Sequence, residues 1–264
     1  MSLNNTQNLQ NSQSGSEPCK QDLLPDQPDI GVFRLNKKSG ETLAIFVERF
    51  RKEYDVAQDV SVTYAGRLDP MAEGEMIVLV GEDCKRKEEF LGLDKTYEFE
   101  VFFGLSTDTF DMLGIITDYK SYTPTKEEIF EKIEVIKNIK EFTYPPYSSK
   151  PVDGVPLFSH ARAGTLPEVL PKMEGEIKSL VLKGLREATF AEAIKQKIEI
   201  IKMIEGDFRQ EEILSGWEKF VSRHGKEKCL IGEFEASVTS GVYIRTLATM
   251  FGGVAYGIKR VRVG

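Results

Sequence analysis

Apolar positions change their spacing along the chain, and each spacing predicts a different element. In residues 95–104, Tyr97, Phe99, Val101 and Phe103 recur at every second position with glutamates between the first of them. A period of two is typical of a strand that buries one face. The run MIVLV in residues 76–80 is uninterrupted and predicts a fully buried strand.

Other segments have the wider spacing of an amphipathic helix. Leu43, Phe46, Val47 and Phe50 form one such stripe. Further helices are expected in residues 126–139, 190–221 and 243–251, and the last should end at the paired glycines that follow it. Additional strands are expected at the start of residues 31–40, after the acidic loop of residues 105–114, and within residues 176–188 and 232–241. Strands separated by helices predict an α+β fold with a mixed, mostly antiparallel central sheet flanked by helices and loops.

The chain divides into a polar tail and one domain. Residues 1–29 are expected to be a disordered tail, because residues 4–16 are almost entirely Asn, Gln, Ser, Thr and Gly. Residues 30–264 contain all the periodic segments and no internal repeat. Within them, residues 144–158 (YPPYSSKPVDGVPLF) are rich in Pro, Gly and Ser and predict a loop.

Composition narrows the class of protein. No apolar run approaches the ~20 residues that span a bilayer, and the N-terminus lacks the pattern of a secretory signal, so a cytoplasmic location is expected. Three scattered cysteines and two distant histidines favour neither a disulfide framework nor a metal site. The net charge of −7 argues against a nonspecific polyanion binder, although basic residues cluster near Lys37, Lys85 and Lys259.

Asp69 is the candidate for chemistry. It lies between Leu68 and Pro70, directly before the buried run, and the proline favours an extended conformation for it. A carboxylate beside a core strand is costly unless it is solvated, paired or used. A short tether would suit a nucleophile, yet Asp-Pro is also a common turn signal. The residues alone leave both interpretations open.

Five motifs, in order along the chain, resemble the TruB-type tRNA pseudouridine synthases, which modify the uridine at position 55 of the tRNA T-arm. The central motif is AGRLDPMAEGEMIVLVGE, which contains the family's Leu-Asp-Pro and the apolar strand after it. The others are GLDKTYEFEVFFGLSTDTFDMLG, PPYSSKPVDGVPLFSHARAG, SGVYIRTLATMFG and GIKRVRVG. The resemblance runs from about residue 31 to residue 264, interrupted mainly in residues 185–228. It implies the pseudouridine synthase fold.

The resemblance also implies roles for individual residues. Asp69 matches the catalytic nucleophile, and Arg245 an arginine that pairs with it. Tyr97 matches a tyrosine that packs on the flipped uracil and whose hydroxyl takes part in proton transfer. Ile258 matches a leucine that lines the base pocket, and Asp111 an acid near the extruded nucleotide.

An isomerisation of uridine gains no atoms, so the family's chemistry requires no redox cofactor and no metal. The implied partner is the T-arm stem-loop of tRNA, whose uridine must be flipped out of the stack, with no obligatory protein partner. Residues 144–166 match the loop that clasps the RNA. Phosphate contacts are expected from the basic residues of the matched motifs. These are Lys37, Lys150, Arg162, Lys259, Arg260 and Arg262.

The sequence departs from the family at several places. Tyr64 stands where the family usually has a histidine that helps to displace the target nucleotide. Two outcomes are open: Tyr64 stacks in place of the histidine, or flipping is slower. Residues 185–228 are expected to be a helical insertion, packed on the catalytic core or supplying RNA contacts. The family's C-terminal RNA-binding extension is not found, which puts tight RNA binding in doubt. Two alternatives stay open: a catalytically silent RNA-remodelling protein, and a synthase for another RNA or with a guide-containing partner.

Overall fold

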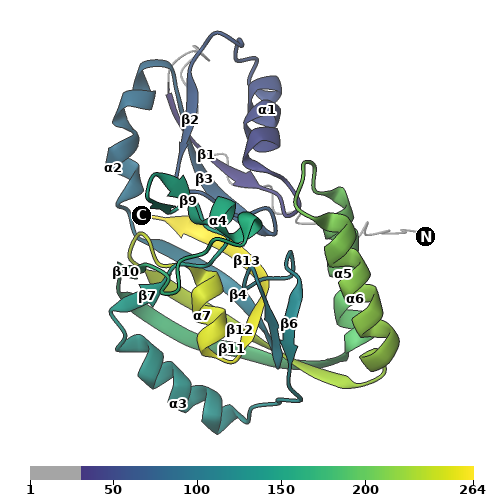
Figure 1. The fold of residues 1–264 in the computed structure, drawn as a ribbon. Coiled ribbons are helices and arrows are strands. Elements are labelled where there is room, and N and C mark those ends of the chain that lie inside the picture. Colours follow the sequence, from purple (N-terminus) through teal and green to yellow (C-terminus); the bar gives the residue numbers. More distant parts are fainter. Residues whose placement is uncertain (1–30) are drawn as a thin grey trace, which may run out of the picture.

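The computed structural model describes residues 31–264, so the expected disordered tail lies outside the described residues. A seven-stranded sheet with the order β1-β3-β13-β4-β12-β11 forms the centre, and β2 pairs with β3 beside this path (Figure 1). All of its pairings are antiparallel except β13 with β3, as the alternating patterns predicted. The strands are β1 (Gly31–Lys37), β2 (Val62–Ala65), β3 (Ala72–Val80), β4 (Lys95–Phe103), β11 (Ile177–Thr189), β12 (Lys228–Val238) and β13 (Gly253–Val263).

Helices and three small two-stranded sheets surround the central sheet. The helices are α1 (Leu43–Glu53), α2 (Lys87–Leu91), α3 (Lys126–Lys137), α4 (Leu157–Ala163), α5 (Phe190–Met203), α6 (Gln210–His224) and α7 (Ile244–Met250), with a 3₁₀ turn, η1, at Gly81–Arg86. The two-stranded sheets pair β5 (Leu105–Thr107) with β6 (Ile116–Tyr119), β7 (Glu141–Thr143) with β10 (Lys172–Glu174), and β8 (Pro151–Val152) with β9 (Val155–Pro156).

Strand β4 shows why the sheet is covered on both faces. Tyr97, Phe99, Val101 and Phe103 are buried in one core cluster with residues of α1, α3 and α7, so their predicted common face is confirmed. Phe102 points the other way and is also buried, in a second cluster built with α5 and α6. The second face is therefore covered by the helical pair at the edge of the view in Figure 1.

Two segments differ in detail from their predicted form. The helical stretch expected in residues 190–221 is two helices, interrupted at Gly206, where φ is +103°. The loop expected in residues 144–158 contains the β8–β9 hairpin and leads into α4. Local turn residues account for both details: Gly206 lies between the two helices, and Asp153 and Gly154, with φ of +50° and +80°, form the two-residue turn of the hairpin.

The one parallel pairing of the described sheet lies next to Asp69. Residues Ile258–Arg260 of β13 run beside Ala72–Gly74 of β3. Gly74 has φ +111°, and a Cβ there would lie 2.1 Å from the carbonyl oxygen of Arg260. Only glycine permits this approach. The crossing brings the last strand beneath the Leu68-Asp69-Pro70 turn.

Candidate active site

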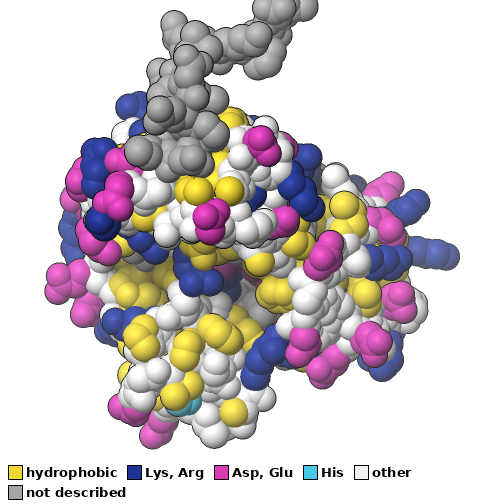
Figure 2. Space-filling model, turned by 90° about the horizontal axis from the view of Figure 1, so that it is seen from above, with side chains coloured by type: hydrophobic (Ala, Val, Ile, Leu, Met, Phe, Trp, Pro, Cys, Tyr) yellow, Lys and Arg dark blue, Asp and Glu magenta, His cyan; other side chains and the backbone are white. Residues whose placement is uncertain are grey.

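A cleft of about 960 Å³ opens between the α1 end of the sheet, the β8–β9–α4 segment and the α5–α6 connection. The space-filling view shows hydrophobic and basic side chains around a central hollow (Figure 2). Its inner wall includes Asp69, Tyr97, Asp111, Arg245 and Ile258, which are widely separated in sequence. The volume suits a ligand the size of a nucleotide.

The turn that carries Asp69 is tied to the fold on both sides. The Gly40 amide donates to the Pro70 carbonyl (2.8 Å), and the Ala72 amide donates to the carbonyl of Asp69 itself (3.0 Å). On the other side, Arg260 donates to the carbonyls of Gly66 and Arg67, each at 3.3 Å. The backbone of the turn is held from flanking elements, so the carboxylate is presented with little freedom.

Arg245 holds the carboxylate of Asp69. Its Nε lies 2.7 Å from Asp69 Oδ2, while Nη1 donates to the Thr109 carbonyl (2.6 Å) and Nη2 to the Tyr147 carbonyl (3.0 Å). The arginine side chain is 3% exposed and the aspartate 36% exposed, so the carboxylate faces the cleft from a buried partner. Burial opposes the charge of Arg245, but Asp69 and Asp111 outweigh it and raise the arginine's pKa.

Asp111 is the buried counterpart of Asp69. Its Oδ1 accepts from the Thr109 hydroxyl (2.7 Å) and the Leu113 amide (2.9 Å), and its Oδ2 lies 3.8 Å from Arg245 Nε. Burial raises its pKa to about 6, against the lowering effect of Arg245. One guanidinium therefore serves two carboxylates in different surroundings.

Three further candidate residues, Tyr97, Ile258 and Tyr64, line the cleft. Tyr97 is buried, and burial raises the pKa of its phenol, so the hydroxyl stays protonated at neutral pH. Ile258 and Tyr64 are half-buried wall residues. The Lys87 ammonium lies 5.6 Å from the centre of the Tyr64 ring. Together they supply a flat, largely apolar surface.

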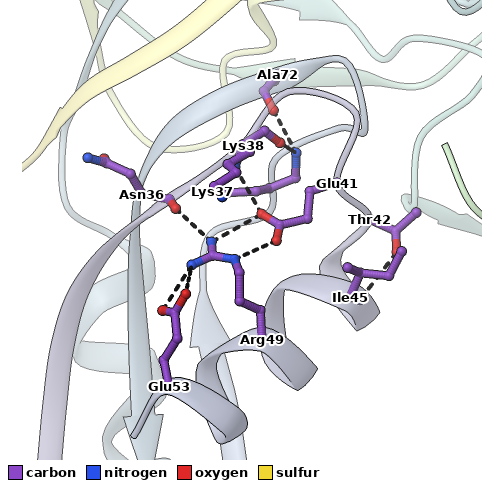
Figure 3. A network of polar contacts seen from close by, with 9 residues as sticks. All are labelled: Asn36, Lys37, Lys38, Glu41, Thr42, Ile45, Arg49, Glu53 and Ala72. Carbon is purple, nitrogen blue, oxygen red and sulfur yellow. Dashed lines mark hydrogen bonds and ion pairs between the residues drawn. The ribbon is translucent and has the colours of Figure 1, made fainter. Parts of the chain in front are cut away.

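Lys37 and Arg260 are buried, whereas a contact with an RNA phosphate requires an exposed side chain. Lys37 is 1% exposed, and its ammonium donates to the carbonyls of Ala72 (2.6 Å) and Lys38 (3.0 Å) (Figure 3). Burial lowers its pKa to about 8. Arg260 is also 1% exposed and bonds to Glu75, Gly66 and Arg67. The expected phosphate contacts of Lys37 and Arg260 are therefore corrected: both cations satisfy carbonyls around the Asp69 turn.

The other residues expected to contact phosphates have exposed or half-buried side chains. Lys150 is half-buried, with its ammonium 5.3 Å from the centre of the Tyr144 ring. Arg162 is 37% exposed, lines the cleft and pairs with Asp207. Lys259 and Arg262 are exposed on β13, but neither lines the cleft.

Sequence reasoning gave no role to several residues that line the cleft, among them Arg67, Tyr147, Phe208 and Arg209. Arg67 is exposed at the cleft, two residues before Asp69, and belongs to the quoted motif without having been given a role. Tyr147, Phe208 and Arg209 also line the cleft. Tyr147 lies within the motif that resembles the RNA-clasping loop, so the sequence could have indicated it. Nothing in the local pattern around Phe208 and Arg209 indicates that they reach the cleft, because that depends on how α5 and α6 pack.

Fold and cleft define an α+β protein with an ion-paired carboxylate in a nucleotide-sized cavity. Residues 51–201 match the family described as "TruB family pseudouridylate synthase (N terminal domain)". This match covers more than half of the chain, which therefore belongs to the TruB family of pseudouridylate synthases.

Several curated proteins are similar to this chain in sequence, and several solved structures are similar to it in fold. The chain is 31% identical over 192 residues to tRNA pseudouridine synthase 4 of Schizosaccharomyces pombe, covering 68% of this chain and 47% of that protein. It is 31% identical over 173 residues to tRNA pseudouridine synthase B of Protochlamydia amoebophila, covering 62% of this chain and 65% of that one. A chain of a Cbf5-Nop10-Gar1 complex superposes with a TM-score of 0.49 at 15% identity, covering 90% of this chain and 50% of that chain. The chain thus spans about half the length of several relatives.

Neither a membrane-spanning helix nor a metal-binding group of side chains is found in residues 31–264. No helix in residues 31–264 combines the length and apolarity needed to cross a bilayer. The same residues contain no group of three or more His, Cys, Asp or Glu side chains arranged to hold a metal ion.

Proposed function

We propose that this protein isomerises a uridine of tRNA to pseudouridine, at position 55 of the T-arm, with Asp69 as the nucleophile. The observation that carries the proposal is the Asp69–Arg245 pair, with Nε 2.7 Å from Oδ2, at a cleft that also contains Tyr97. Membership of the pseudouridylate synthase family and the relatives' names supply the reaction class.

The reaction breaks the bond between uracil N1 and ribose C1′ and forms a bond between C5 and C1′. The proton leaves C5 and N1 gains one, so the product has the atoms of the substrate. A carboxylate nucleophile must be held in a fixed position, and the buried guanidinium of Arg245 orients Asp69 at the cleft. The apolar walls at Tyr97 and Ile258 hold the detached base away from water while it turns.

Base flipping brings the uridine to Asp69. Extrusion from the loop costs a few kcal/mol, which stacking and edge contacts in the cleft offset. Tyr64, which lines the cleft, offers an aromatic face for this step. Arg67 and Arg162, which line the cleft, and Lys150, which follows the lining residue Ser149, are cations available for the RNA backbone.

The test compares the full chain with Asp69→Asn on an unmodified tRNA transcript, with pseudouridine mapped by carbodiimide-stop sequencing. Asp59→Asn, a change at an exposed aspartate outside the cleft, is the matched control. We expect conversion at position 55 with wild type and control and none with Asp69→Asn, a loss of at least about 10³-fold.

Other outcomes would separate the alternatives. RNA binding without conversion by the wild type indicates a remodelling protein and refutes the proposal. Conversion at another site retains the chemistry and overturns the substrate assignment.

A further inference from the structure

The connection between α5 and α6, residues 204–209, forms one wall of the cleft although it lies far along the chain from the motif residues. Asp207, Phe208 and Arg209 all line the cavity. We propose that Arg209 is a positioning residue: it braces the two backbone segments that hold Arg245, and so fixes the aim of Asp69. This inference rests on the proposed function.

The α5–α6 pair is firmly anchored. Trp217 of α6 is fully buried, and its indole N–H donates to the Met112 carbonyl at 3.1 Å. The Tyr256 hydroxyl of β13 donates to the Ala193 carbonyl of α5 at 2.8 Å. Both partners lie in or beside the sheet, so the pair moves with the core and carries its connection in a fixed place.

The connection itself is also ordered from within. The side chain of Gln210 accepts from the Phe208 amide (2.8 Å) and donates to the carbonyls of Ile204 (2.9 Å) and Gly206 (2.7 Å). Arg209 has φ +61°, in the left-handed region that a residue other than glycine adopts at a cost in backbone energy. A strained residue held by its surroundings is a reason to look for a role.

Arg209 reaches two segments at once. Its Nη1 lies 2.6 Å from Asp108 Oδ2, and its guanidinium carbon lies 4.3 Å from the centre of the Tyr147 ring. The ion pair is four-fifths buried on the arginine side and the ring contact is a close cation–π pair. Both contacts are therefore stronger than those of an arginine on an open surface.

Those two segments supply the carbonyls that orient Arg245. Tyr147 provides one, at 3.0 Å, and Thr109, the residue after Asp108, provides the other, at 2.6 Å. Arg209 thus lies behind both acceptors of the arginine that binds Asp69. Displacement of a reacting group by about 1 Å can cost about 10²-fold in rate.

A second contact closes the same wall. Arg162 of α4 pairs with Asp207, at 3.2 Å between Nη1 and Oδ2, and also bonds to the Asp207 carbonyl. The clasping segment is therefore joined to the α5–α6 connection at both Tyr147 and Arg162. Direct binding of a phosphate by Arg209 is disfavoured, because Asp108 already neutralises its charge.

The experiment compares wild type, Arg209→Ala and Arg209→Lys, with Arg223→Ala as the matched control on the exposed part of α6. Alanine keeps a Cβ at the left-handed position, so the backbone preference there is not relaxed as glycine would relax it. Single-turnover conversion at saturating tRNA and RNA affinity at two salt concentrations are measured for each.

We expect Arg209→Ala to slow the single-turnover rate by about 10- to 100-fold, with RNA affinity and its salt dependence unchanged. Arg209→Lys should recover part of the rate, because it keeps a cation for Asp108 but lacks the flat group on Tyr147. Arg223→Ala should match wild type. If Arg209→Ala does not fold, Arg209→Lys carries the test, with a smaller loss of rate expected.

A readout independent of activity is the carboxyl titration of Asp111 by carbon-13 NMR. The charges acting on Asp111 are those of Arg245, which lowers its pKa, and Asp69, which raises it. A displaced Arg245 should therefore raise the pKa of Asp111 above the wild-type value of about 6. This arm tests the brace even if the wild type forms no pseudouridine, which would refute only the proposed function.

Two results would overturn the inference. An unchanged rate together with an unchanged Asp111 titration in Arg209→Ala would show that Arg245 does not depend on Arg209. A normal rate with weaker RNA binding, and a salt slope smaller by about one phosphate contact, would make Arg209 an RNA ligand instead.

Discussion

Two turns bring an aspartate to the same guanidinium, and they differ in what surrounds the carboxylate. The turn at Asp69 opens into the cleft, and its carboxylate is 36% exposed and 2.7 Å from Arg245 Nε. The turn at Asp111 is closed, and its carboxylate is 7% exposed and 3.8 Å from the same nitrogen. Asp111 satisfies its oxygen Oδ1 within its own turn, through Thr109 and Leu113.

Under the proposed function, this difference in exposure distinguishes the carboxylate that reacts from the carboxylate that supports Arg245. A nucleophile needs access, which the Asp69 carboxylate has at the edge of the cleft, beside a buried cation. Asp111 also lines the cleft but is nearly buried, and its Oδ2 lies 3.8 Å from Arg245 Nε. Under the proposed function, one arginine therefore contacts a reacting carboxylate and a second carboxylate that supports it.

Removing Arg245, the partner that Asp69 and Asp111 share, affects both turns and should have the largest effect. In Arg245→Ala the buried Asp111 carboxylate loses its cation, and Asp69 loses its orientation. We expect turnover to fall by about 10³-fold or more, with a modest loss of RNA affinity, and the free energy of unfolding to fall by roughly 3 kcal/mol. Single-turnover kinetics and denaturant unfolding measure the two effects.

Arg245→Lys sharpens that test. Lysine keeps the charge but cannot donate from fixed positions to Asp69, Thr109 and Tyr147 together. Its turnover should stay well below wild type. Near-normal turnover in Arg245→Ala would contradict the proposed pairing.

Asp111→Asn isolates the closed turn, through pH. Because burial raises the pKa of Asp111 to about 6, the folded protein binds a proton between pH ~4 and ~6 that the unfolded chain has released. Stability from this group is therefore highest below pH ~4 and decreases as pH rises to ~6. Relative to wild type, the free energy of unfolding of Asp111→Asn should increase by roughly 2–3 kcal/mol over this interval.

Unfolding by urea at pH 4.5 and pH 7 measures that difference. A constant difference between variant and wild type at the two pH values would show that Asp111 is not an unusually weak acid in the folded protein. It would also remove the distinction between the two turns.

Arg67→Ala concerns the open turn alone and should have the smallest effect. Arg67 is exposed at the cleft, two residues before Asp69, so under the proposed function it is a candidate contact for a backbone phosphate. We expect RNA affinity to fall by about 3- to 10-fold and the salt slope by about 0.7–0.9, with the rate at saturating RNA retained. Filter binding over a salt series, with Arg223→Ala as control, checks this; an unchanged slope would exclude a phosphate contact.

Local patterns and motifs predicted the frame of this molecule well. The period-two pattern at Tyr97–Phe103 gave the orientation of β4, and the ordered motifs indicated that Asp69 and Arg245 should meet across 176 positions. The pairing of Asp69 with Arg245 could be predicted only from the family resemblance, because Asp69 alone could be part of a turn and Arg245 alone could be a surface arginine.

The remainder depends on tertiary packing. Lys37 and Arg260 belong to basic clusters in the sequence, but a cluster does not reveal which side chain turns inward to satisfy carbonyls. The contact of Arg209 with Asp108 joins residues 101 positions apart and depends on how the helical pair packs, which Trp217 and Tyr256 help to fix. Pattern-based reasoning has no access to such distances.

The most direct test of the central claim is a crystal structure of Asp69→Asn bound to a T-arm stem-loop RNA. The account predicts that the target uridine is flipped into the cleft, with its ribose C1′ or uracil ring within about 3.5 Å of the residue-69 side chain and Tyr97 against the base. A uridine that stays stacked in the RNA loop, or that binds away from residues 69 and 245, would contradict it.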